Sequence, residues 1–249
     1  GGLINLAERG VVKVVGGALS EEEGIDGQVI LASKAAYDDG LTSPAALAGR
    51  SYAVTQPGSS FHYMAHKIAE AEGIATDEVR MVPLQKVGAI VGALKSGQVD
   101  AWSIVPNVGV GLSNAPEVEM IGLVSDYIPD YQVTTVFTST ANIDENPDLV
   151  SRFLSAFSKG AADFNAALVD KTSGDDDEVV GLIHKYVYTD RPLERAEPAI
   201  RAGGMRISQN AALNTTSLQD QLDWFQSQGF VDDSVTLDTF VDAQFVETN

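Results

Sequence analysis

The sequence predicts an α/β protein, because strand-like and helix-like segments alternate over its first half. Two further observations agree with that class. The 249 residues suffice for one large or two modest domains. Hydrophobic residues make up 44% of the chain and charged residues 20%, which is an ordinary globular balance. The alternation favours mainly parallel strands joined by crossover helices.

Strands are predicted where β-branched, aromatic and other apolar residues form short runs between turn residues. The run Ser-Tyr-Ala-Val-Thr-Gln, for example, ends at Pro57-Gly58. Strands are expected at residues 27–33, 51–56, 79–84, 99–105, 118–124 and 131–139. Helices are expected to start at Pro44, at Ser59 or Ser60, at about residue 85 and at Pro106, and later at Pro147 and near residues 175, 193 and 217.

The turn after the strand at residues 51–56 has the composition of a ligand-facing turn. Ser59 or Ser60 can cap the following helix, in which Phe61, Met64, Ala65, Ile68 and Ala69 recur at helical spacing. The start of such a helix carries unpaired N–H groups and the positive end of the helix dipole, which suits an anion or a polar group. An ordinary strand-to-helix turn with a serine cap is the alternative.

The second half of the chain is predicted to be mainly helical. Asn146-Pro147-Asp148 is typical of a helix start. The helix that follows is expected to bury one apolar stripe, made of Leu149, Val150, Phe153, Leu154, Phe157, Ala161 and Phe164. The acidic residues 175–178 are read as the start of another helix, since the ligand spacing and mid-loop glycine of a calcium loop are missing.

The charge and the cysteine count exclude several functions. The 35 acidic and 16 basic residues give a formal net charge of -19, and the basic residues are scattered, so neither nucleic acid nor an anionic membrane is an expected partner. The chain has no cysteine, which excludes disulfides, thiolate metal sites and a cysteine nucleophile. No apolar run approaches the 18 or so residues of a membrane-spanning helix.

Catalytic motifs are also missing, so we expect neither an enzyme nor a cofactor. His62 and His66 have the spacing of a zinc pair, but no third histidine is near in sequence, and a solvated polar edge is the favoured interpretation. The serine-hydrolase, phosphate-loop and dinucleotide motifs do not occur.

Candidate binding residues lie where predicted strands end, because ligands of open α/β sheets bind beyond the carboxyl ends of the strands. Phe61 and Trp102 are the aromatic candidates, although either could instead belong to the core. The polar candidates are Gln56, Ser59, Ser60, Asn107 and Asp126.

Three stretches together resemble the substrate-binding proteins of ABC transporters for nitrate, sulfonates, taurine and thiamine pyrimidines. These stretches are "SPAALAGRSYAVTQPGSSFHYMAHKIAEAEG", "ALKSGQVDAWSIVPN" and "NPDLVSRFLSAFSKGAADFNAAL". The resemblance implies a type II periplasmic-binding fold, with two α/β lobes joined by crossing strands near residues 32–45 and 128–135. Lobe 1 would comprise residues 1–44 and 133–249, and lobe 2 residues 45–132.

The resemblance also implies a site and a function. Ser59 and Ser60 would offer hydroxyl and N–H donors, and Phe61 and Trp102 would stack on or enclose a small solute. Gln56, Asn107 and Asp126 are further candidates. A periplasmic or extracellular receptor, with a lipid anchor as an option, would act as a monomer and deliver this solute to an ABC permease.

Other interpretations stay open at this point. Members of this group normally open with a strand, a helix and a second strand that this chain lacks, so an incomplete sequence is expected. A thiamine-pyrimidine biosynthetic enzyme of related fold would need a cysteine-rich motif, and a transcription regulator would need a DNA-binding segment ahead of residue 1. The solute could be a sulfonate, a carboxylate or a planar heterocycle; the lack of arginine in the matched turns tilts the choice toward a neutral or aromatic ligand.

Overall fold

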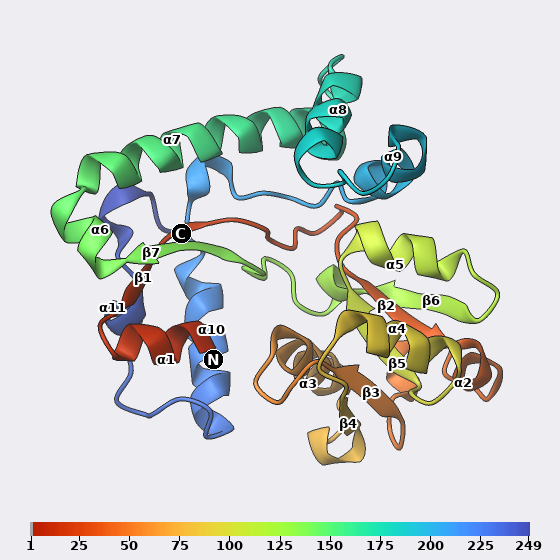
Figure 1. Ribbon diagram of the computed structural model, residues 1–249. Helices are drawn as coiled ribbons and strands as arrows, with labels where there is room; N and C mark the ends of the chain where they lie inside the picture. Colours follow the sequence, from red (N-terminus) through yellow and green to blue (C-terminus); the bar gives the residue numbers. More distant parts are fainter. Residues whose placement is uncertain (1) are drawn as a thin grey trace. The chain divides into compact units, whose positions relative to one another are not determined.

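The chain divides into two compact units, and each unit is assembled from separate stretches of sequence. The structure is a computed structural model, drawn in Figure 1, that describes residues 2–249. Unit 1 comprises Gly1–Glu21, Asp130–Asp175 and Arg206–Asn249, and unit 2 comprises Glu22–Pro129 and Asp176–Met205. Within residues 2–249, no helix combines the length and apolar character that a bilayer crossing requires.

Unit 2 contains a five-stranded mixed sheet with the order β4-β3-β5-β2-β6. Its strands are β2 (Val29–Ser33), β3 (Ser51–Val54), β4 (Arg80–Pro83), β5 (Ala101–Ile104) and β6 (Val118–Leu123). β3 pairs in parallel with β4 and β5, whereas β2 lies antiparallel between β5 and β6. Every residue of β2 is buried, as expected for a strand covered on both faces.

Helices cover this sheet and extend it on one side. α4 and α5 pack over the face that carries Trp102 (Figure 1), and α3 packs on β3 and β5. The helices of unit 2 are α2 (Lys34–Asp38), η1 (Pro44–Ala46), α3 (Ser60–Ala71), η2 (Thr76–Glu78), α4 (Val87–Lys95), α5 (Pro106–Ser113), η3 (Val124–Asp126), α8 (Asp176–Tyr186) and α9 (Leu193–Ala202).

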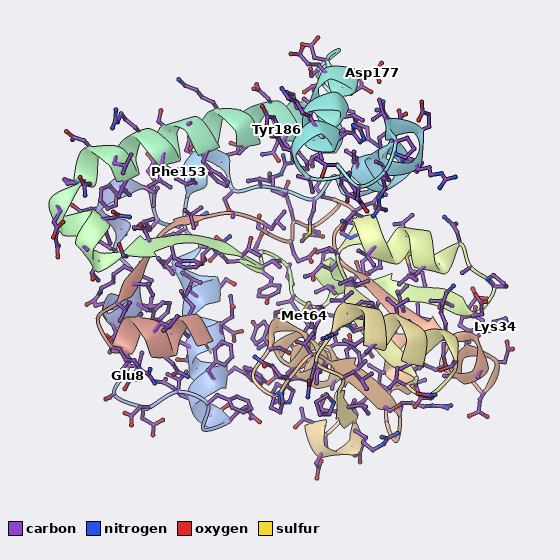
Figure 2. The ribbon with its side chains drawn as sticks, viewed as in Figure 1. Glu8, Lys34, Met64, Phe153, Asp177 and Tyr186 are labelled. Atoms are coloured by element: carbon purple, nitrogen blue, oxygen red, sulfur yellow. The ribbon has the colours of Figure 1, made fainter. Side chains whose placement is uncertain are left out.

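One arginine joins the start of α8 to α9. Arg201 Nη1 donates to Asp176 at 2.7 Å, Nη2 to Asp177 at 2.5 Å and Nε to Glu197 at 2.8 Å. These carboxylates raise the pKa of Arg201 further above its ordinary value. Asp177 and Tyr186, labelled in Figure 2, mark the two ends of α8. The acidic residues therefore begin a helix, as predicted, and they also fix the helix to its neighbour.

Unit 1 is built around a two-stranded antiparallel sheet of β1 (Val12–Gly17) and β7 (Thr135–Ser139). Helices pack on it, and its core centres on Val15, Val150 and Leu154. The helices of unit 1 are α1 (Gly2–Glu8), α6 (Thr140–Glu145), α7 (Pro147–Phe164), η4 (Asn165–Val169, a π-helix), η5 (Gln209–Ala211), α10 (Thr215–Ser227), α11 (Leu237–Phe240) and η6 (Ala243–Phe245).

The buried side chain of Gln132 joins the three stretches of unit 1. Its Nε2 donates to the carbonyl oxygens of Leu19 at 3.1 Å and Thr134 at 2.9 Å, and its Oε1 accepts from the backbone N–H of Asn214 at 3.2 Å. Nε2 also contacts the Ser208 hydroxyl at 3.3 Å. Because the side chain is only 2% exposed, water does not replace these bonds.

The α/β class is confirmed, but the expected parallel pairing holds only for β3 with β4 and β5. β1 and β7 pair antiparallel, and so do the pairs that β2 makes. The physical reason is connectivity. Unit 2 separates β1 from β7 along the chain, so no single crossover helix between them dictates a parallel direction.

The compact units also have boundaries that differ from the expected lobes. Residues 22–44 and 176–205 were expected in lobe 1, but they group with unit 2. β2 hydrogen-bonds to β5 and β6, and α9 packs on α5, so pairing and packing place both stretches there. The assignment of lobes that act in binding stays a prediction.

The apolar stripe expected on α7 is wider than the face that the helix buries. Val150, Leu154 and Ala161 are buried, whereas Leu149 and Phe153 are 49% and 56% exposed (Phe153 is labelled in Figure 2). α7 packs on α6, η5 and η6, which are short elements that cover only one narrow side of it. Complete burial of the stripe was therefore a wrong prediction.

We expect Gln132→Met to destabilise the chain by about 2–4 kcal/mol, because a side chain of similar volume leaves buried carbonyl and N–H groups without partners. Urea unfolding at neutral pH measures the change. The exposed Gln228, whose amide contacts only Ser227, gives the control Gln228→Met, with an expected change below about 0.5 kcal/mol. Equal stability of the two variants would contradict the role assigned to Gln132.

Candidate functional site

Four strands of unit 2 end at the same edge of its sheet. β3, β4 and β5 run parallel, and β6 runs in the same direction because both β5 and β6 are antiparallel to β2. The turns that follow these strands therefore lie along one edge. In open α/β sheets this is the edge at which ligands bind.

Three helices start at this edge, since α3 follows β3, α4 follows β4 and α5 follows β5. Each helix start presents backbone N–H groups and the positive end of a dipole. Ser59 is the N-cap of α3 and accepts from the N–H of His62 at 3.4 Å, which confirms the predicted serine cap. Lys86 precedes α4 without a side-chain cap bond, and Pro106 opens α5.

The turns after β3 and β4 are joined by backbone hydrogen bonds. Gln85 donates its N–H to the carbonyl oxygen of Thr55 at 2.8 Å, and it has a φ of 63°, which is unusual for a residue other than glycine. Its side chain is exposed. A strained residue at the start of a ligand-facing helix is typical of positions where the surroundings fix the backbone.

The predicted residues of the first turn lie together beside β5. Gln56 and Ser60 are exposed, and Ser59 and Phe61 are half-buried. The Phe61 ring lies 5.7 Å from the Trp102 ring, measured between centroids, with 51° between their planes. This turn therefore presents a polar rim with an aromatic ring next to it.

Trp102 lies in the core of unit 2 and is fully buried. Its indole Nε1 finds no hydrogen-bond acceptor among the residues that the structure describes. This placement favours the core alternative, in which Trp102 supports Phe61 from below. Direct stacking of Trp102 on a solute stays a prediction without support from its exposure.

Asn107 and Asp126 occupy different parts of the same edge. Asn107 is in the first turn of α5, and its Nδ2 donates to the Tyr188 hydroxyl at 3.0 Å. Asp126 is exposed in η3 after β6, and β2 separates β6 from β5 in the sheet. The structure thus brings Asn107 to the strand next to the Ser59 turn and places Asp126 beyond β2.

Sequence reasoning missed Tyr188, because it lies 81 residues after Asn107 in a stretch assigned to the other lobe. Tyr127 was considered only as an aromatic after β6. Burial and a hydrogen bond to Glu72 raise the pKa of Tyr127 to about 12, so its hydroxyl stays protonated at neutral pH.

The arrangement can bind but has no evident catalytic set. Across residues 2–249, no group of three histidine, cysteine, aspartate or glutamate side chains is placed to hold a metal ion. His62 instead orders the turn, since its Nδ1 accepts the N–H of Gly58 at 3.2 Å. Burial, and secondarily the charge of His66, lowers the pKa of His62, which keeps the ring neutral.

Residues 30–167, more than half of the chain, match the family model described as NMT1/THI5 like. The chain belongs to the NMT1/THI5-like family. This confirms the family resemblance drawn from the quoted stretches. No curated protein sequence matches the chain.

Solved structures with the same fold include binding proteins and an enzyme. The ligand-binding component of an ABC-type import system from Staphylococcus aureus, with zinc bound, is 13% identical, with a TM-score of 0.73 over 98% of this chain and 76% of that one. The periplasmic aliphatic sulphonate-binding protein SsuA from Escherichia coli is 18% identical, with a TM-score of 0.70 over 96% and 72%. The desulfurization enzyme DszB is 16% identical, with a TM-score of 0.61 over 98% and 82%. These likenesses confirm the type II periplasmic-binding fold and, at such low identity, nothing about the ligand.

We expect the turn at Gly58 to weaken in acid. Because the folded state lowers the pKa of His62 from 6.5, the unfolded chain binds more protons below that pH. The contribution of neutral His62 is complete above about pH 6.5 and is lost as the pH falls through the folded pKa.

Melting temperatures of the wild type and His62→Gln at pH 7.5 and 5.0 test this expectation. The wild type should lose at least about 2 °C more than the variant over this range. Between pH 7.5 and 8.5, where His62 is neutral in both states, the two proteins should change in parallel. Parallel behaviour down to pH 5.0 would show that His62 has no such role.

Proposed function

We propose that this chain is the solute-binding component of an ABC importer and captures a small organic solute by hinge closure. One observation carries the proposal: the starts of α3, α4 and α5 gather at one sheet edge in a chain of the NMT1/THI5-like family. Such an edge binds a solute through backbone N–H groups and a few polar side chains.

The proposed contacts come from the turns after β3 and β5. Ser59, Ser60 and Asn107 supply polar groups, Phe61 supplies an apolar face, and Gln56 lies at the exposed rim. Trp102 acts from beneath Phe61. Asp126, beyond β2, is the most peripheral of the candidates.

The solute is a sulfonate, a carboxylate or a pyrimidine-like heterocycle. Helix starts and serine hydroxyls suit the anions, and the aromatic ring of Phe61 suits the heterocycle. That a protein of the same fold is named for aliphatic sulphonate binding supports including sulfonates among the candidates.

A membrane permease is the proposed partner, and the chain acts as a monomer in the periplasm or outside the cell, with a lipid anchor as an option. The net charge of -19 supports the absence of nucleic acid among its partners. Charge of one sign also keeps a protein soluble and favours a monomer.

An enzymatic role has less support, although DszB has the same fold. One structure of that enzyme is of a mutant in which serine replaces a cysteine, in complex with biphenyl-2-sulfinic acid. The 249 residues of this chain contain no cysteine, so a thiol could not take part in a reaction here. A fold shared between binding proteins and an enzyme does not by itself assign catalysis.

A thermal-shift screen against alkanesulfonates, nitrate, aromatic carboxylates and pyrimidines tests the proposal. A solute at 100 times its Kd should stabilise the chain by about 2.7 kcal/mol. For a chain of this size that corresponds to a rise of about 5–10 °C in the melting temperature. If no compound raises it, the receptor function is wrong.

Two serine caps provide a matched pair for locating the site. Ser59 caps α3 at the proposed site, and Ser139 caps α6 in unit 1 through the same kind of bond. Ser59→Ala should weaken the solute found in the screen at least about threefold, whereas Ser139→Ala should leave its affinity unchanged. Calorimetric titration distinguishes the two, and equal affinities would move the site elsewhere.

A further inference from the structure

Asn107 and Tyr188 form a hydrogen-bonded pair at the edge where α5 begins. The Asn107 Nδ2 lies 3.0 Å from the Tyr188 hydroxyl oxygen, although 81 residues separate the two in sequence. Asn107 follows β5 directly, and Tyr188 lies between α8 and α9. The pair exists because α9 packs on α5.

Close packing holds Asn107 in place. A Cβ added to Gly203, just after α9, would lie 3.1 Å from the Asn107 Cβ, so the backbone there already presses against this side chain. On the other side, a Cβ added to Gly109 would collide with a methyl group of Val29, so α5 lies directly on β2. Asn107 is therefore fixed relative to both α9 and the sheet.

Tyr188 is fixed by its own turn. The guanidinium of Arg191 lies 5.5 Å from the centre of the Tyr188 ring, and His184 Nε2 lies 2.8 Å from the Arg191 carbonyl oxygen. Arg191 also binds both carboxylate oxygens of Asp190, at 3.1 and 3.0 Å. That ion pair neutralises the positive charge beside Tyr188.

The pair has hydrogen-bonding capacity left over. The Tyr188 oxygen accepts from Asn107, and its own proton has no acceptor in the described part of the chain. Asn107 Oδ1 likewise accepts no hydrogen bond from residues 2–249. Both side chains are half-buried. The pair thus presents one donor, the tyrosine hydroxyl, beside one acceptor, the asparagine oxygen.

We infer that Asn107 and Tyr188 select an uncharged solute that carries a hydrogen-bond acceptor next to an N–H donor, as primary amides and aminopyrimidines do. This inference rests on the proposed function, because it assigns specificity to the same sheet edge. The hydroxyl donates to the acceptor of the solute, and its N–H donates to Asn107 Oδ1. The neutralised Arg191 leaves no free cation beside the pair to favour an anion.

Calorimetric titration of the full chain with matched compounds tests the inference. In each of two pairs, 4-aminopyrimidine against pyrimidine and benzamide against methyl benzoate, only the first compound has both groups. Ethanesulfonate and benzenesulfonate represent the anions. We expect at least one first compound to bind about tenfold or more tighter than its partner, because a site with polar groups rejects an analogue that leaves them unpaired.

Two variants connect that preference to the pair. Tyr188→Phe keeps the ring and removes the donor, and it should weaken the preferred compound about three- to tenfold. Tyr186→Phe is the matched control, since Tyr186 is 72% exposed two residues away and its ring also lies near a cation, 5.0 Å from Lys185 Nζ. Asn107→Asp should weaken binding as well, because a carboxylate would take the tyrosine proton for itself. A thermal melt of each variant verifies that it folds.

The outcomes separate this inference from the proposed function. If sulfonates bind and no neutral compound does, the receptor function stands and the inference is wrong. The inference is also wrong if a neutral compound binds and Tyr188→Phe changes its affinity less than twofold. If neither the neutral compounds nor the anions bind, both the inference and the receptor function are contradicted.

Discussion

The antiparallel insertion of β2 between β5 and β6 is the constraint on which the candidate site depends. All five residues of β2 are buried, and its backbone hydrogen-bonds to a strand on each side. Without β2, β6 would have no partner in the sheet order, and the face under α5 would lose Val29 and Leu31. Because β2 reverses direction, β5 and β6 run the same way and end at one edge, where their polar turns meet.

Close backbone packing carries that order to the side chains. Gly109 lets α5 lie on Val29, and this contact sets the position of Asn107 slightly earlier in the same helix. α9 then packs on α5, and the Arg201 carboxylate cluster holds α8 beside α9. Each exposed ion pair contributes little by itself, but three carboxylates around one guanidinium fix a geometry. Tyr188 thereby reaches Asn107 through packing that begins at the sheet.

Unit 1 solves a different problem, because it has only two strands and three separate stretches of chain. A two-stranded sheet is marginal alone, so helices and a buried polar hub supply the remaining stability. Gln132 joins residues from each stretch through one amide group. The hub requires every partner to be in place, which makes it specific as well as stabilising.

The sequence by itself determined the α/β class, most strand and helix positions, the Ser59 cap and the family, because local propensity, capping and turn residues act over a few neighbours. Only the tertiary structure decided the reversed direction of β2, the antiparallel β1–β7 pair, the exposure of Phe153 and the burial of Trp102. It also decided that Asn107 meets Tyr188, across 81 residues. Strand direction and such contacts depend on how distant stretches pack, and no short window of sequence contains that information.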